Sequence, residues 1–334
     1  MRTLAALRTL LPALALALPP SAWAQGGFGP KELGLLVLGQ GGGEEWKKFS
    51  QALAKSLGAE IPVEVNAGSP GTSDLLRSLE KLKTARVKKI AVVPLYLRSD
   101  DPDLEQARYL LGIAQYPSEG VMKGEHSRMG SARIKRALTK IPLSMTQALD
   151  EDPAVSQALS ERALQMSREP ERDAVIVVEL GRADDQGSEA RLRALQGHAK
   201  RVREAGKFRD ARAVLLRSDA PKVPGTAPDL GKKIGRGAKE SSLRELRDAV
   251  RELSSQGRVI AVPCLLAKDG SERRMRKALE GLFHQWKGEA LLPSDALASW
   301  TLTRMEEARR LPDMIKFRDE GKALPPAPTF KDKK

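Results

Sequence analysis

Apolar and polar positions follow one another along the chain in an order that predicts parallel strands separated by helices. The run LGLLVL at 33–38 is apolar throughout, as in a strand that is covered on both faces. Residues 44–57 then predict a helix, because their large apolar residues recur at helical spacing. A strand at 62–65, a helix at 72–84 and a strand at 88–97 complete a β-α-β-α-β unit, for which right-handed crossovers are expected.

The same order of elements occurs a second time. IAVVPLYLRSDD in the first half matches IAVPCLLAKDGS in the second, so that Pro94 corresponds to Pro263. The two earlier strands of the second copy are expected within 173–182 and 210–219, and its third within 257–270. We therefore predict an α/β protein of two homologous lobes around a cleft, each with a mainly parallel sheet of four or five strands.

Composition changes along the chain predict the domain boundaries. The first lobe is expected at 33–168 and the second at 173–310, where a basic insertion at 221–239 has the composition of a solvated loop. Residues 25–32 are expected to form a flexible leader. Residues 311–334 form a C-terminal extension whose tail, LPPAPTFKDKK, is expected to be disordered.

The first 24 residues predict a cleaved signal peptide. Arg2 and Arg8 are followed by an apolar Leu/Ala run and by small residues at Ala22 and Ala24, which fit an A-x-A cleavage site. The alternative is a membrane anchor, but the apolar run is too short to span about 30 Å of hydrocarbon. The mature chain is expected to start near Gln25, to be periplasmic or secreted, and to have no transmembrane segment.

Net charge and cysteine content limit the kinds of binding partner and the kinds of reaction that are expected. The net charge is +14, or +12 once Arg2 and Arg8 are removed, and no nucleic-acid-binding motif accompanies it. A solvated basic surface is the first interpretation, and an anionic ligand or membrane surface the second. Cys264 is the only cysteine, lies in an apolar run and is expected in the core. The sequence leaves the oligomeric state open.

The order and spacing of these motifs resemble the class II tetrapyrrole chelatases, in particular the sirohydrochlorin cobaltochelatase and ferrochelatase branch. The resemblance rests on a strand ending in a G-x-G turn, on IAVVPLYL, and on ALDEDPAVSQALSERALQMS, and covers most of 33–310 as two copies. It implies two flavodoxin-like lobes and insertion of a divalent metal (cobalt, nickel or iron) into an anionic, polycarboxylate tetrapyrrole held in the cleft.

The chain departs from this family at the residues that bind the metal. The histidine of the family's G-H-G turn is replaced by Gln40, and in the second copy this position falls on Leu180. The second family histidine is missing from PLYLRSDDPDLEQ and from PCLLAKDGSERR. Imidazole can both ligate a borderline metal and accept a proton near neutral pH, whereas a carboxamide is a weak ligand and no useful base. No catalytic residue is therefore assigned.

Three groups remain as candidates for binding. The metal candidates are Asp100 and Asp101, which could instead belong to a solvated loop that begins a helix at Asp101–Pro102, and His126, whose alternative is an exposed loop residue. The anion or tetrapyrrole candidates are backbone N–H groups of a glycine turn and cations of the basic insertion. These candidates are Gly41, Gly42, Gly43, Lys232, Lys233 and Arg236.

Three functions fit these observations. The first is an exported, catalytically degenerate relative of the chelatases that binds a metal, a tetrapyrrole or a partner, which the ligand chemistry favours. The second is an active chelatase, and the third is an exported solute-binding protein whose lobes resemble chelatase lobes.

Overall fold

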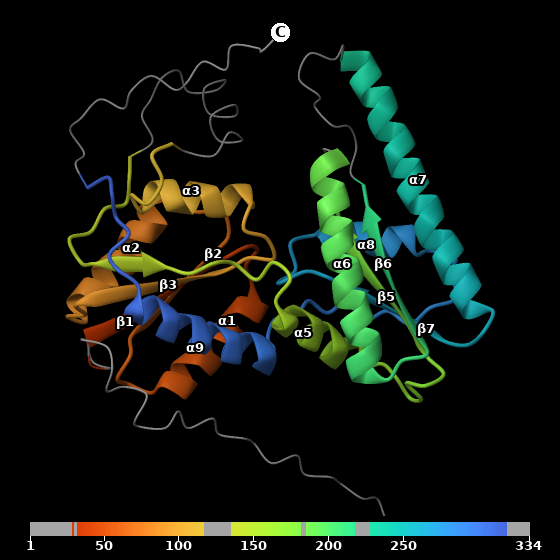
Figure 1. The fold of residues 1–334 in the computed structure, drawn as a ribbon, viewed down its shortest axis with the longest axis horizontal. Helices are drawn as coiled ribbons and strands as arrows, with labels where there is room; N and C mark the ends of the chain where they lie inside the picture. The colour runs from red at the N-terminus through yellow and green to blue at the C-terminus, as the bar shows by residue number, and fades with distance from the viewer. Residues whose placement is uncertain (1–28, 30–31, 117–134, 182–184, 218–227, 319–334) are drawn as a thin grey trace, which may run out of the picture.

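The computed structural model describes residue 29 and residues 32–116, 135–181, 185–217 and 228–318, with only the backbone described for 185–187 and 228–236. It contains two α/β lobes side by side (Figure 1). The predicted signal peptide, most of the leader, His126 and the end of the C-terminal tail lie outside the described residues. None of the described helices is long and apolar enough to cross a bilayer.

The first lobe is built on a four-stranded parallel sheet, sheet A, in the order β2-β1-β3-β4. This is the beginning of the flavodoxin-like order 2-1-3-4-5. Its strands and following helices occur where the hydrophobic pattern predicts them. In chain order they are β1 (Leu33–Gly39), α1 (Glu44–Leu57), β2 (Val63–Ala67), α2 (Thr72–Thr84), β3 (Lys89–Leu95), α3 (Pro102–Leu110) and β4 (Leu143–Met145).

The second lobe repeats this arrangement in a three-stranded parallel sheet, sheet B, ordered β6-β5-β7. From the connection between the lobes onward the elements are, in chain order, α5 (Pro153–Leu164), β5 (Ala174–Leu180), α6 (Asp185–Gly206), β6 (Asp210–Leu216), α7 (Pro228–Ser254), β7 (Val259–Pro263), α8 (Ser271–Ala278) and α9 (Asp295–Arg310). All of them except α9 belong to the second lobe. The prediction of four or five strands is wrong for sheet B. The described chain beside β7 makes a single isolated bridge, Ile260 to Gln285, where sheet A has β4.

Strand register demonstrates the repeat. Leu38 pairs with Pro94 in sheet A, and Val178 pairs with Pro263 in sheet B. Gly39 therefore corresponds to Glu179, and Gln40 corresponds to Leu180. The predicted alignment of the two copies is confirmed at the end of the first strand.

The two lobes exchange their last helices. α9, at the end of the second copy, packs on β3, β4 and α1 of the first lobe, whereas α5 packs on α6 and β7 of the second. Figure 1 shows this exchange: the blue helix α9 lies beside α1, and α5 lies beside α6. One hydrophobic core consequently runs from sheet A through α1, α9, α5 and α6 to sheet B. Separate cores lie outside it, under α2 and α3 in the first lobe and under α7 and α8 in the second.

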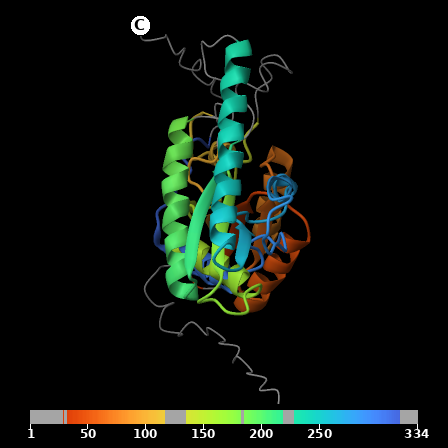
Figure 2. The same ribbon diagram turned by 90° about the vertical axis from the view of Figure 1, so that its right-hand side faces the viewer.

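The basic insertion is not a loop over its whole length. From Pro228 onward it forms the beginning of α7, a helix of 27 residues. Figures 1 and 2 show α7 continuing well past the end of sheet B. Lys232, Lys233 and Arg236 belong to this first part of α7, where only the backbone is described.

The C-terminal extension begins as an ordered segment on the first lobe. The backbone N–H of Met314 donates to the carbonyl of Leu143 (2.8 Å), and Asp313 Oδ1 accepts from the N–H of Leu143 (3.0 Å). Lys89 Nζ, at the start of β3, donates to the carbonyls of Arg309 and Leu311 at the end of α9. The bonds of Lys89 hold the end of α9 on the first lobe, and the segment at Asp313 and Met314 covers the outer edge of β4.

Candidate functional site

The candidate site lies where the strands of sheet A end, because Gln40 directly follows β1 and the residues after β3 reach the same edge. Gly39 fixes the beginning of the turn around Gln40. A Cβ atom on Gly39 would come within 2.2 Å of the Trp46 ring, so only glycine admits the indole there. The Trp46 Nε1–H donates to the carbonyl of Gln40 (2.7 Å), which holds the turn against α1.

The Gln40 side chain is bound to Asp101. Its Nε2 donates to Asp101 Oδ2 at 2.6 Å, so the fold brings Gln40 into contact with the acidic segment that follows β3. Sequence analysis identified Gln40 and Asp101 separately, but it did not predict this bond. The available signal was that a polar side chain at the end of one parallel strand faces the residues that follow the neighbouring strand.

Both carboxylate oxygens of Asp101 have partners. Oδ1 caps α3 by accepting from the Asp103 N–H (2.9 Å), as the sequence Asp101–Pro102 predicts for a helix start. Oδ2 accepts from Gln40 and lies 3.9 Å from Arg98 Nη2. Burial raises the pKa of Asp101, and the nearby Asp103 carboxylate also raises it, while α3 N–H groups and Arg98 act in the opposite direction.

The acidic residues after β3 point to different partners. The Asp100 side chain is exposed and lies 3.6 Å from Arg98 Nε, and Asp103 Oδ2 accepts from the Ser69 hydroxyl (3.1 Å). Among the described residues no three His, Cys, Asp or Glu side chains converge on a point where they could hold a metal ion. A metal role for Asp100 and Asp101 stays a prediction, and in the present geometry Asp101 serves a different purpose.

The glycine turn that follows Gln40 forms a contact between the lobes. Gly41 has φ +78°, and a Cβ there would lie 3.2 Å from that of Ala267 in the loop after β7. Gly43 precedes α1 without a side-chain cap. The first turn of α1 carries Glu44 and Glu45, and Glu45 Oε1 lies 3.9 Å from Lys268 Nζ of the other lobe. A ligand carboxylate approaching the N–H groups of Gly41, Gly42 and Gly43 would therefore meet two protein carboxylates.

The corresponding place in the second lobe holds a buried ion pair. Glu179, at the end of β5, accepts from Arg191 Nε (2.7 Å) and pairs with Arg191 Nη2 (2.6 Å). Cys264 Sγ lies 3.9 Å from Arg191 Nη2 and is fully buried, and burial raises the pKa of its thiol. Sequence analysis missed the pair, although a single acid in the apolar strand AVIVVEL requires a buried partner.

A hydrogen-bond network joins the connection between the lobes to the loop that carries Asp101. Asp150 Oδ1 accepts from the Ser99 N–H (2.7 Å), and the Asp150 carbonyl accepts from His198 Nε2 (3.2 Å). His198 Nδ1 is 2.8 Å from the Ser156 hydroxyl. Burial lowers the pKa of His198 to about 4, so the ring is neutral at physiological pH and both of its nitrogens are used in holding α5 to α6.

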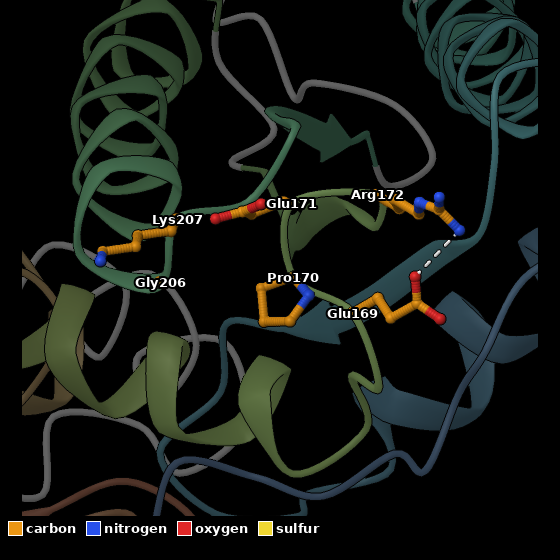
Figure 3. A pocket seen from close by; sticks show the side chains of 6 residues that line it. All are labelled: Glu169, Pro170, Glu171, Arg172, Gly206 and Lys207. Atoms are coloured by element: carbon orange, nitrogen blue, oxygen red, sulfur yellow. Dashed lines mark ion pairs between the residues drawn. The ribbon is translucent and has the colours of Figure 1, made fainter.

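A surface pocket lies at the opposite end of sheet B, before β5 and after α6 (Figure 3). Its charged lining consists of two acids and two bases. Arg172 Nη1 is paired with Glu169 Oε2 at 3.1 Å, and Glu171 and Lys207 lie nearby, with Pro170 between the two acids (Figure 3). This charge-balanced lining does not select a cation or an anion.

No protein-family model matches the chain, and neither does any curated protein. Solved structures do match. SirB from Bacillus subtilis with Fe3+ aligns with 83% of this chain and 96% of its own at 16% identity and a TM-score of 0.50. The sirohydrochlorin chelatase SirB from Bacillus subtilis subspecies spizizenii in complex with cobalt aligns with 83% of this chain and 95% of its own, at 15% identity and a TM-score of 0.49.

DR2241 from Deinococcus radiodurans, a multi-domain protein with structural similarity to chelatases, also matches. It is 16% identical, its TM-score is 0.50, and the alignment covers 84% of this chain and 56% of DR2241. The chain thus spans about half the length of DR2241. With the two parallel sheets and the strand orders described above, the matches to SirB with Fe3+ and to DR2241 show that the chain has the chelatase-like fold, as the sequence motifs predict.

Proposed function

We propose that this chain is an exported, chelatase-fold binding protein that holds an anionic tetrapyrrole without inserting a metal into it. The observation that carries the proposal is the 2.6 Å hydrogen bond between Gln40 Nε2 and Asp101 Oδ2, at the place where the family would bind the incoming metal. At the position of the family's first histidine the chain thus has a neutral amide that is already bound to the Asp101 carboxylate.

Metal insertion requires a ligand for the metal, a base for the pyrrole protons and an open coordination position. The Gln40 amide is a weak ligand and no useful base. Asp101 is 3% exposed and both of its oxygens are engaged, so binding a metal would break the α3 cap or the bond to Gln40. The residues present at this site therefore do not fit the metal substrate.

Charge supports a polycarboxylate as the ligand. The chain has 57 Lys and Arg against 43 Asp and Glu, and the predicted mature chain keeps a net charge of +12 after Arg2 and Arg8 are removed from +14. A tetrapyrrole bearing several carboxylates is the ligand class that the chelatase fold suggests, and a basic protein attracts it at long range.

Binding can be tested with a carboxylated, metal-free porphyrin by following its Soret band during titration with the chain beginning at Gln25. We expect a saturable shift that weakens as salt rises, because charge attraction is screened. An unshifted band at all protein concentrations would contradict tetrapyrrole binding. Export is tested separately: N-terminal sequencing of the natural protein should begin near Gln25, and recovery of the intact chain from the cytoplasm would contradict it.

A second candidate, an active chelatase, is favoured by the structural likeness to SirB over 83% of the chain. The two functions predict different effects of Gln40→His on the affinity for cobalt. If Gln40 closes a former metal site, the histidine variant should bind cobalt measurably more tightly than the unmodified chain. Gln51→His places the same side chain on the exposed face of α1 and is the matched control. Equal cobalt affinity in all three proteins would contradict the role assigned to Gln40.

A further inference from the structure

The turn after α8 presents an exposed aromatic residue next to a basic helix. Phe283 is 87% exposed, which sets it apart from the other exposed large apolar side chains of the described residues, Leu76 at 38% and Leu164 at 44%. Its neighbours hold the turn in place. Leu282 and Trp286 pack partly against the core of the second lobe, and His284 Nδ1 donates to the carbonyl of Leu282 (2.9 Å).

α8 divides into an apolar face and a basic face. Met275 and Ala278 are buried in the core of the second lobe, while the exposed arc carries only cations. Together with Phe283 and a lysine of the following turn, these cations form what we call the α8 tip. Its members are Phe283, Arg273, Arg274, Arg276, Lys277 and Lys287, all exposed. Two exposed acids, Glu280 and Glu289, lie in the same stretch, so cations outnumber acids by five to two.

We propose that the α8 tip binds the surface of an anionic phospholipid membrane, with Phe283 inserted among the lipids and the cations at the headgroups. An exposed apolar side chain that accompanies Lys and Arg on an adjoining helix is the arrangement by which peripheral proteins bind such surfaces. Each cation near the surface tightens binding by about fivefold, which corresponds to roughly 1 kcal/mol. A single-stranded nucleic acid fits less well, since it needs successive aromatic residues along a groove and Phe283 is one residue on a turn.

The position of the turn with Phe283 allows a membrane to be bound while the site at Gln40 and Asp101 is occupied. Gln285 N–H donates to the carbonyl of Val259 (2.7 Å), the first residue of β7, so the turn with Phe283 lies at the beginning of the sheet B strands. The turn after Gln40 meets the second lobe at Ala267, beyond the end of β7. The turn with Phe283 therefore lies at the opposite end of sheet B from that contact. The inference does not depend on the proposed function.

Vesicle sedimentation tests the proposal. The protein used in the assay begins at Gln25 and keeps the rest of the chain, so that the apolar N-terminal segment cannot account for binding. We expect binding to phosphatidylglycerol-containing vesicles and little binding to pure phosphatidylcholine. Phe283→Ser should weaken binding by about tenfold, and Arg276→Ala/Lys277→Ala by at least about tenfold.

Two matched controls separate this surface from a diffuse effect of net charge. Lys47→Ala/Lys48→Ala removes two exposed cations from α1, and Leu164→Ser replaces another exposed apolar side chain. Both should bind vesicles nearly as well as the unmodified chain. The proposal is overturned if anionic vesicles are not bound, if Phe283→Ser has no effect, if the controls lose as much affinity as the α8 variants, or if a single-stranded oligonucleotide or an acidic protein binds the tip while vesicles do not.

Discussion

His198 makes the fold sensitive to mild acid, and the size of the effect follows from its burial. The ring is fully buried between α5 and α6, and burial lowers its pKa from 6.5 to about 4. The Arg191 and Arg201 guanidinium groups also lower this pKa, whereas the Asp150 carbonyl and the Asp152 carboxylate raise it. Protonation in the folded state would put a positive charge beside two arginines.

The free energy of unfolding decreases in acid because the unfolded chain binds the proton at a higher pH than the folded chain does. Above pH 6.5 the imidazole is neutral in both states, and the folded protein has its full stability. As the pH falls below 6.5 the unfolded chain is protonated while the folded chain is not, so the free energy of unfolding decreases until the folded-state pKa near 4 is reached. A shift of this size costs about 3 kcal/mol in total and about 2 kcal/mol between pH 7.5 and 5.

Urea unfolding of the unmodified chain and of His198→Gln at pH 7.5 and pH 5 measures this effect. Glutamine can accept from Ser156 and donate to the Asp150 carbonyl but does not titrate, so the variant should lose about 2 kcal/mol less than the unmodified chain over this interval. His284→Gln is the matched control, because His284 lies on the turn after α8, and it should retain the full pH dependence. Equal pH dependence in the unmodified chain and His198→Gln would refute the reasoning.

Three further predictions concern contacts that hold the site and the lobes. Asp101→Ala removes the α3 cap and the partner of Gln40 and should lower the free energy of unfolding, measured in urea, by about 2 kcal/mol. Asp101→Asn keeps the cap through its Oδ1 and can donate from Nδ2 to Gln40 Oε1 once the Gln40 amide rotates, so it should stay within about 0.5 kcal/mol. Glu179→Gln strands the buried Arg191 charge and should cost about 3 to 5 kcal/mol, while Glu179→Leu combined with Arg191→Met should restore most of the thermal stability; a double variant as unstable as the single one would count against this. Lys89→Met removes the donor at the end of α9 and should cost about 1 to 3 kcal/mol, with faster hydrogen exchange confined to the last turn of α9. Unchanged exchange there would show that Lys89 does not fasten the helix.

Local patterns predicted most of the elements, whereas contacts between distant segments were not predictable. The strands near Leu33 and Lys89 are continuous apolar runs, and Asp152–Pro153 marks the beginning of α5, so these elements follow from short stretches of sequence. The exchange of α5 and α9 could not be predicted, because an apolar helix face fits either sheet and the choice depends on how the connecting chain crosses between the lobes. The missing fourth strand of sheet B likewise depends on a tertiary path, since Gln285 forms only one bridge.

The sequence predicted where the residues of the candidate site lie, but it did not predict which of them are hydrogen-bonded to each other. The family resemblance indicated Gln40 and the region of Asp101 as the places of the missing histidines, and parallel topology puts both at one edge of the sheet. Their 2.6 Å bond depends on the turn that Gly39 and Trp46 fix and on the α3 cap, which involve side-chain packing. Glu179 and Arg191 are 12 residues apart and pair for a similar reason, since a charge buried in an apolar core needs an opposite charge beside it.

The initial rate of cobalt insertion into sirohydrochlorin shows whether the Gln40–Asp101 bond has replaced a metal site. The rate is measured by absorbance without protein, with the unmodified chain, and with Gln40→His and Gln51→His. Our account predicts that the unmodified chain forms cobalt product no faster than the solution without protein. A rate about tenfold or more above that background, retained in Gln51→His, would contradict the account and show that this chain inserts metal through other residues.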